Sequence, residues 1–252
     1  CDDFAQSIAD ANPGSALANL LPQFKRWYSQ AGTPRLAARG EYDAAAQTYT
    51  LHFSQSCAPT PGQAAKEPFV IPVSLGLVGA ASGAALPLQV QGSSVAGADS
   101  HLFVLTEASQ SLTFTGVSEE PVPSILRGFS APVVLDFDYS DAQLLTLLAN
   151  DPDPFNRWEA GQRLALRSAI NSIAAGADTT GATPLNDAYI DAMRAVLRHP
   201  TLDAAFKELV LTLPSETYIA EQLDVVDPQR IHAVREAMRL QLATALQAHW
   251  EW

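Results

Sequence analysis

The hydrophobic pattern of this chain changes its period twice, and these changes limit the folds that it can adopt. After Pro34 apolar residues alternate with polar ones, as they do at Tyr49, Leu51 and Phe53. From Ser140 onward the apolar residues recur at helical spacing instead. Alternation is typical of a strand with one buried face, whereas the wider spacing indicates amphipathic helices. The chain is therefore predicted to be an α+β multidomain protein, in which a strand-rich part precedes an all-helical part.

The strand-rich part contains several short runs separated by clusters of glycine, serine and proline. Besides Tyr49–Phe53, the runs cover 69–78, 86–90, 102–105, 111–115 and 133–139. Short strands at close spacing with frequent turn residues favour an antiparallel sandwich of about a hundred residues. We therefore predict an immunoglobulin-like β-sandwich over residues 33–139.

Helical patterns lie on both sides of the predicted sandwich. Two of them, 1–11 and 17–30, precede it, and five follow Ser140, at 155–175, 184–198, 202–213, 215–223 and from 228 onward. Ser140 and Gln143 fit a capping box, and Thr183-Pro184 and Asp227-Pro228 each fit an N-cap followed by proline in the first turn. Short helices joined by tight links predict a helical array of the α-solenoid type over 140–252, of which only the start is present.

Composition excludes several classes of partner. The 252 residues carry 27 acidic against 15 basic side chains, a formal net charge of −12. Nucleic acids and anionic membranes both require a basic face, so neither is an expected partner. No stretch approaches the roughly 20 apolar residues of a membrane span. The cysteines Cys1 and Cys57 are expected to be reduced thiols in a cytoplasmic protein, although a single disulfide between them stays open.

The histidines do not form a zinc-protease motif. Such a motif needs His-Glu-x-x-His on one helix, and neither the adjacent glutamate nor the second histidine occurs at His52, His101, His199, His232 or His249. The acidic run from Asp136 to Asp141 lacks the glycine and glutamate that a calcium loop requires, and a strand end followed by a helix cap explains it better. Trp27 and Trp158 are expected to pack in the core. No catalytic, cofactor-binding or metal-binding residue is therefore predicted.

An ordered set of motifs resembles one enzyme family. The run from Arg26 to Pro34 resembles the junction between the zinc-bearing domain and the β domain of the aminopeptidase N family of bacterial zinc metallopeptidases. The stretch from Gln55 to Ala64, with Thr-Pro-Gly-Gln, resembles a loop of that β domain. Further likenesses follow in the same order at 121–126, 129–133, 155–160, 211–215 and 227–237. The resemblance covers nearly the whole chain.

This resemblance implies that the chain is an internal piece of a zinc-dependent aminopeptidase, which removes N-terminal residues from peptides. Both ends look like cuts. Residues 1–32 would be the last helices of the catalytic domain, 33–139 the β domain, and 140–252 the beginning of the helical domain. The family's zinc ligands and catalytic glutamate lie upstream of Cys1. The segment would serve as a spacer and partial lid, inactive by itself and without zinc of its own.

Two further expectations stay open from the sequence. The alternative function is a non-enzymatic scaffold, in which the sandwich and the helical array bind a protein partner. Apolar surface near Ile231, Val234, Leu242 and Trp250 is expected to be exposed or covered by self-association, because the helical array would lack its continuing neighbours.

Overall fold

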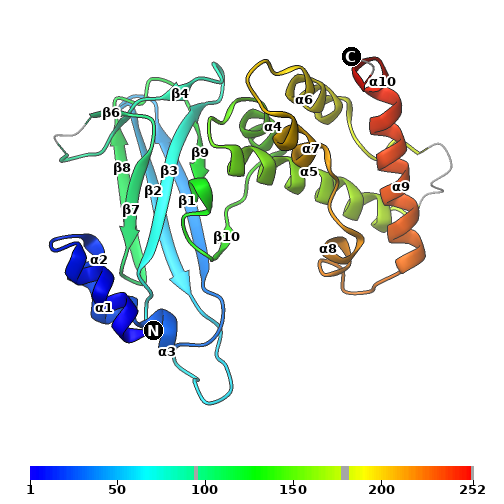
Figure 1. The fold of residues 1–252 in the computed structure, drawn as a ribbon. Coiled ribbons are helices and arrows are strands. Elements are labelled where there is room, and N and C mark those ends of the chain that lie inside the picture. The colour runs from blue at the N-terminus through cyan, green and yellow to red at the C-terminus, as the bar shows by residue number, and fades with distance from the viewer. Residues whose placement is uncertain (94–95, 177–181, 251–252) are drawn as a thin grey trace. The chain divides into compact units, whose positions relative to one another are not determined.

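The chain folds into two compact units (Figure 1). The structure, a computed structural model, describes residues 1–93, 96–176 and 182–250. One unit comprises Cys1–Ala81 and Ala85–Asp138, and the other Ser82–Ala84 and Tyr139–Trp252. The first, which we call the β unit, contains the β-sheets, and the second, the helical unit, consists mainly of helices, which confirms the predicted α+β fold class.

The first sheet shows the alternation that the sequence predicts. Its strands are β1 (Arg35–Asp43), β2 (Thr48–Ser56), β8 (Ser109–Thr115) and β10 (Val134–Asp136), in the order β10-β1-β2-β8. Tyr49, Leu51 and Phe53 are all buried, whereas the residues between them are only half-buried. The β1–β2 and β2–β8 pairs are antiparallel, but β10 pairs with β1 in parallel.

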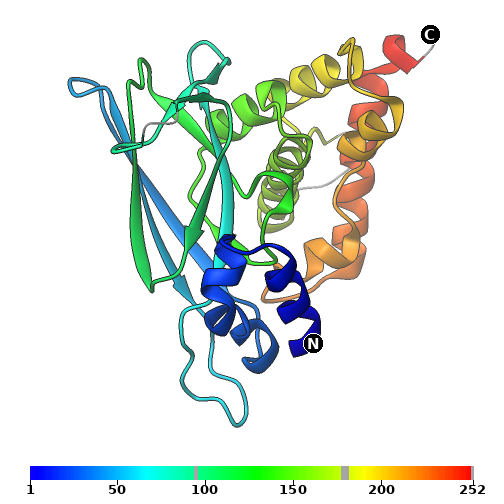
Figure 2. The same ribbon diagram turned by 60° about the vertical axis from the view of Figure 1, so that its left-hand side comes forward.

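The second sheet is built around β3 (Ile71–Gly79), which pairs with β4 (Ala85–Leu86), β7 (His101–Leu105) and β9 (Pro121–Ile125). A short pair, β5 (Leu88–Gln89) and β6 (Ala96–Ala98), lies outside both sheets. In Figure 2 the β1–β2 hairpin (blue) runs obliquely from the upper left, and β3 (cyan) stands to its right. Inward-facing residues of both sheets form one core, which includes Leu36, Phe53, Val73, Leu75 and Phe114.

Three strands, β1, β6 and β9, were not predicted from the sequence, and for two of them the reason is identifiable. β1 presents Gly40 to the core, and the Tyr49 ring covers this glycine, so a Cβ added there would overlap the ring. β9 contains Pro121 and Pro123, and in the described part of the chain the strand that pairs with it is β3. Prolines are tolerated in such an edge position of a sheet. The predicted strand at 69–78 begins only at Ile71.

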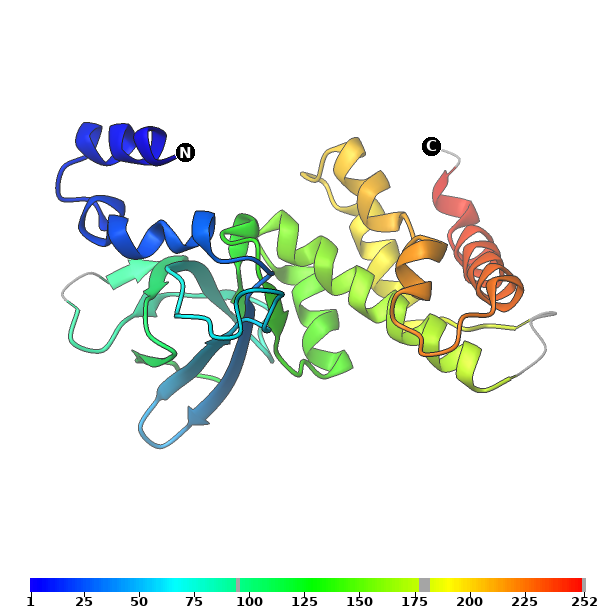
Figure 3. The ribbon, with the colours of Figure 1, turned by 90° about the horizontal axis from the view of Figure 1, so that it is seen from below.

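Three helices precede the strands and belong to the same unit. They are α1 (Asp2–Ala11), α2 (Ala16–Phe24) and α3 (Arg26–Ser29). The single helical stretch predicted at 17–30 is thus divided at Lys25. Leu21 packs with Ala5 and Ala9 of α1 in a small apolar cluster. Figure 3 shows α1 lying over α2, on the side away from the strands.

The helical unit comprises α4 (Asp141–Asn150), α5 (Pro154–Ala174), α6 (Asp187–Arg198), α7 (Ala204–Leu211), α8 (Glu216–Ala220), α9 (Pro228–Ala245) and α10 (Gln247–Trp250). The capping box of Ser140 is present, and Asp227 caps α9 as predicted. The acidic run 136–141 is thus the end of β10 followed by the cap of α4.

Two expectations about the helical unit are wrong. α6 does not begin at Thr183-Pro184, because Asn186 is the cap and its side chain accepts a 2.8 Å hydrogen bond from the Tyr189 amide. Ile231, Val234 and Leu242 are not exposed, since they are 2%, 1% and 5% accessible within the unit. The side chain of Trp250 lies outside the described part. Among the described residues, no helix is both long and apolar enough to cross a membrane.

Candidate functional site

The most elaborate polar site in the β unit surrounds residues 67–70, an extended segment that we call the clamped strip. The strip lies immediately before β3 but belongs to no strand. Phe69 and Val70 are only 2% and 7% exposed. Buried main-chain carbonyls need hydrogen-bond donors, which a sheet neighbour normally supplies. Here side chains supply all of them.

Two glutamines pair with the clamped strip as a neighbouring strand would. The Gln30 amide donates to the Glu67 carbonyl at 3.0 Å, and its oxygen accepts from the Glu67 N–H at 2.7 Å. Gln55 forms the same pair of hydrogen bonds with Phe69: it donates to the Phe69 carbonyl at 2.9 Å and accepts from the Phe69 N–H at 2.7 Å. Each glutamine thus satisfies both main-chain groups of one strip residue.

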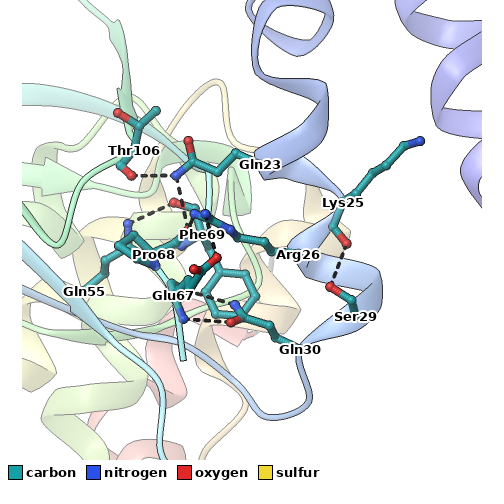
Figure 4. A network of polar contacts seen from close by, with 10 residues as sticks. All are labelled: Gln23, Lys25, Arg26, Ser29, Gln30, Gln55, Glu67, Pro68, Phe69 and Thr106. Atoms are coloured by element: carbon teal, nitrogen blue, oxygen red, sulfur yellow. Dashed lines mark hydrogen bonds and ion pairs between the residues drawn. The ribbon is translucent and has the colours of Figure 1, made fainter. Parts of the chain in front are cut away.

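The helices α2 and α3 hold the remaining carbonyls (Figure 4). Gln23 and Arg26 donate to the Pro68 carbonyl at 3.2 and 2.6 Å. The indole N–H of Trp27 donates to the Val70 carbonyl at 2.8 Å. The carbonyls of all four strip residues therefore accept side-chain hydrogen bonds, and most of the donors come from the N-terminal helices.

Two of these three glutamines also donate hydrogen bonds to the turn between β7 and β8. Gln23 donates to the Thr106 carbonyl at 2.6 Å, and Gln55 donates to the Glu107 carbonyl at 3.0 Å. Gln23 and Gln55 thus join the clamped strip to a second part of the β unit.

The linker between α3 and β1 is held separately by the loop after β2. Gln63 accepts from the Ala31 N–H at 2.8 Å and donates to the Ser29 carbonyl at 2.7 Å. The Lys66 ammonium donates to the Ala31 carbonyl at 2.8 Å and to the Thr60 hydroxyl at 2.7 Å. The linker therefore has fixed hydrogen-bond partners on both its amide and its carbonyl side.

Apolar packing adds to the hydrogen bonds. The Trp27 ring lies 4.7 Å from the Phe69 ring, centroid to centroid, and packs against the core of the sandwich, as the sequence predicted. Each hydrogen bond contributes about 0.5–1.5 kcal/mol, and the charged Arg26 donor contributes more. The ion pair of Arg26 with Glu67 adds less than about 1 kcal/mol, because the glutamate is mostly exposed. The contacts together fix the helices on the β unit.

Two of the motifs in the ordered set that carries the family resemblance meet at this site. The run Arg26–Pro34 supplies Arg26, Trp27 and Gln30, and the stretch that begins at Gln55 supplies Gln55 and Gln63. Sequence reasoning did not identify Gln23 or the clamped strip, because no local pattern marks a glutamine that bonds to main chain 45 residues away.

The histidines make separate contacts, each with different residues. His101 contacts the Phe114 ring edge-on, and burial lowers its pKa. His232 pairs with Glu216 at 2.8 Å, His199 caps α6, and His249 contacts Arg198. Within the described ranges, no three His, Cys, Asp or Glu side chains are grouped so that they could hold a metal ion. Trp158 is half-buried against Phe155.

One row on the outer face of the first sheet has the residue types of a serine hydrolase. The Ser111 hydroxyl lies 2.8 Å from His52 Nδ1, and a Glu41 oxygen lies 3.5 Å from His52 Nε2. Acyl transfer also needs donors for the developing oxyanion. Ser111 on β8 and His52 on β2 are directly paired cross-strand neighbours, so their side chains stand on the same face of the sheet and meet without any further arrangement. The row is therefore best described as a surface hydrogen-bonded chain.

Two family models match the chain. One, described as a domain of unknown function (DUF3458) with an Ig-like fold, matches residues 32–138. The other, described as a domain of unknown function (DUF3458_C) with ARM repeats, matches residues 141–252. These descriptions agree with the β-sandwich and the helical array.

Curated relatives match nearly the whole chain. It is 39% identical over 246 residues to the aminopeptidase N of Escherichia coli K12, covering 98% of this chain and 27% of that protein. Identity to the aminopeptidase N of Haemophilus influenzae is 37% over 247 residues, with the same coverages. That of Caulobacter vibrioides is 41% identical over 227 residues, covering 90% of this chain and 24% of that protein.

Among solved structures, aminopeptidase A of Legionella pneumophila, crystallised in complex with aspartic acid, has the same fold over 99% of this chain and 26% of its own. The TM-score is 0.75 and the sequence identity 24%. This chain thus spans about a quarter of the length of the curated relatives it matches.

Proposed function

We propose that this chain is a non-catalytic segment of a zinc-dependent aminopeptidase acting on peptides, because it belongs to the aminopeptidase N family. In this proposal the β unit is a spacer next to the catalytic domain, and the helical unit contributes part of a lid. The support is homology over 98% of the chain to proteins named aminopeptidase N.

The clamped strip is the observation that carries the spacer role. If residues 1–32 are the last helices of the catalytic domain, then Gln23, Arg26, Trp27 and Gln30 join that domain to the β unit. Rigid attachment is what a spacer needs, because a loosely tethered spacer could not fix the position of anything beyond it.

The zinc of the longer enzyme would have to be held elsewhere. The described residues offer no suitable group of ligands, so we derive no catalytic step from this chain. When bound in the enzyme, zinc would polarise the scissile carbonyl and activate water. A cytoplasmic location is also proposed, which the two free cysteines, Cys1 and Cys57, support.

The spacer proposal can be tested in the full-length enzyme with the double variant Gln23→Ala/Arg26→Ala. The variant loses three hydrogen bonds to the strip and the β7–β8 turn, about 2–4 kcal/mol of docking energy. We expect proteolysis within residues 29–34 to accelerate at least tenfold. We also expect kcat/KM for an alanyl reporter to fall while zinc content stays unchanged.

The matched control is Lys25→Ala. Lys25 lies between the two altered residues but points away from the strip, and pairs with Asp2 at 3.2 Å (Figure 4). An unchanged kcat/KM in a double variant whose linker is readily cleaved would refute the spacer role.

A second test uses this chain alone. We expect it to hydrolyse no aminoacyl reporter and to bind no stoichiometric zinc. Chelator-sensitive activity in pure material, together with one zinc per chain, would overturn the non-catalytic assignment. Light scattering on the same sample would test self-association, for which the buried Ile231, Val234 and Leu242 offer no surface.

A further inference from the structure

A groove of about 370 Å³ in the helical unit collects basic side chains from three helices. Its charged and titratable lining consists of Arg198 at the end of α6, the following His199, Lys207 of α7 and His249 of α10. Leu197, Pro200 and Ala248 complete the wall, and no acidic residue lines the groove among the described residues. Such a cluster is notable in a chain with a formal net charge of −12.

Both imidazoles carry a donor N–H. Arginine stays protonated, so the contact at 3.3 Å between Arg198 Nη2 and His249 Nδ1 makes this nitrogen an acceptor. The proton of neutral His249 therefore resides on Nε2. His199 Nδ1 accepts from the Thr201 N–H at 3.3 Å, which places its proton on Nε2 as well. The four groups are thus all hydrogen-bond donors.

The two permanent cations have no carboxylate partner in the described part of the chain. Neither Arg198 nor Lys207 has an acidic residue within ion-pair distance there, whereas the neighbouring Arg194 is paired with Asp191. Lys207 is half-buried, counted over the whole residue. A cluster of donors without acceptors fits a ligand that offers only acceptors.

We propose that this groove, formed by Arg198, His199, Lys207 and His249, binds a compact oxyanion, either a phosphate or a carboxylate group. A water molecule occupies about 30 Å³ in the liquid. A groove of 370 Å³ therefore has room for the oxyanion together with several further ligand atoms, which would contact Leu197, Pro200 and Ala248. The proposal does not depend on the spacer role of the β unit.

The positive charges around the groove make the pKa of His249 a measure of anion binding. Desolvation, with the charges of Arg198 and Arg194, lowers the pKa of His249. A bound oxyanion opposes these charges and favours imidazolium, so the pKa of His249 should rise on binding.

The experiment follows the imidazole Cε1–H resonances of His199 and His249 by NMR. Inorganic phosphate and acetate are added in separate titrations at constant ionic strength. We expect saturable shifts of both resonances, and a rise in the pKa of His249 at saturation. Saturation by phosphate alone assigns a phosphate group, and saturation by acetate alone assigns a carboxylate. Saturation by both supports a general oxyanion site.

Two variants identify the site. Arg198→Gln and Lys207→Gln should each weaken binding about tenfold or more. The control is Arg239→Gln, which removes the same charge from an arginine that pairs with Glu236 on α9. Amide spectra show whether each variant is folded. If one of the two site variants does not fold, the other still tests the proposal. Shifts linear in both anions, or equal affinity in the site variants and the control, would overturn the proposal.

Discussion

Gly76 of β3 lies directly beneath a buried arginine, and replacing it with alanine should destabilise the β unit strongly. A Cβ at position 76 would come well within 3.0 Å of the guanidinium carbon and both terminal nitrogens of Arg127, closer than Cβ atoms approach in proteins. Arg127 is 6% exposed, so its guanidinium cannot simply move into solvent.

The magnitude follows from the bonds that hold this guanidinium. It donates to the Ser124 hydroxyl at 2.8 Å, the Asp99 carbonyl at 2.7 Å and the Ser100 hydroxyl at 2.9 Å. A hydrogen bond to a charged group contributes about 1.5–3 kcal/mol. Loss of two of them on displacement makes Gly76→Ala about 3–6 kcal/mol less stable.

A double-mutant cycle isolates the clash. Arg127→Ala alone should cost about 4 kcal/mol or more, because it removes all three hydrogen bonds and leaves their partners unsatisfied. Once the guanidinium is absent, the methyl group of Ala at position 76 has space. The double variant should therefore be about as stable as Arg127→Ala alone, a coupling of about 3 kcal/mol.

Urea unfolding followed by fluorine NMR of 5-fluorotryptophan provides the assay. The chain has four tryptophans, of which Trp27 reports on the β unit. Ser74→Ala, two residues away on the same face of β3, is the control and should change stability by less than about 1 kcal/mol. Additive costs in the cycle, or a Gly76→Ala cost below 1 kcal/mol, would refute the reasoning.

Three further predictions concern single contacts. Trp27→Phe keeps most of the packing but loses the bond to Val70, so it should cost about 1 kcal/mol in urea unfolding of the β unit, and Trp27→Ala clearly more. Asp227→Ala removes the cap of α9 and should cost about 1 kcal/mol in thermal unfolding of the helical unit, whereas Asp227→Asn should restore most of it. Burial lowers the pKa of His101, so the unfolded chain takes up this proton first as pH falls below about 6.5. The β unit should lose stability there, and His101→Gln should flatten that loss in urea titrations between pH 7 and 5; equal slopes would contradict the assignment.

Local patterns predicted the elements whose side chains obey local rules. The alternation at Tyr49, Leu51 and Phe53 predicted β2 because one face of that strand is buried and the other is not. Ser140 and Asp227 predicted helix starts because an N-cap depends only on the next three residues. Asn186 was missed because the neighbouring Thr183-Pro184 offers the same kind of signal three residues earlier.

Elements that depend on distant residues could not be predicted in this way. β9 is a strand despite Pro121 and Pro123, because β3 pairs with it along one side. Residues 69 and 70 of the clamped strip were predicted as the start of a strand, but the strip lies outside the sheet, since its hydrogen-bond partners are supplied by Gln23, Gln30 and Gln55 from other segments. The segments that contain Gln30 and Gln55 could be recognised from the sequence as similar to a protein family. Their role in holding the strip could not.

The clamped strip sets unusual rules for how this part of the protein can change in evolution. Because its partners contact main-chain atoms, exposed side chains such as Glu67 can be replaced with little loss. Positions 67 and 69 must keep an N–H, whereas position 68 donates no such bond and accommodates its proline. Insertion or deletion of a single residue would shift every carbonyl out of register with its donor. This segment should therefore tolerate substitution but strictly conserve its length.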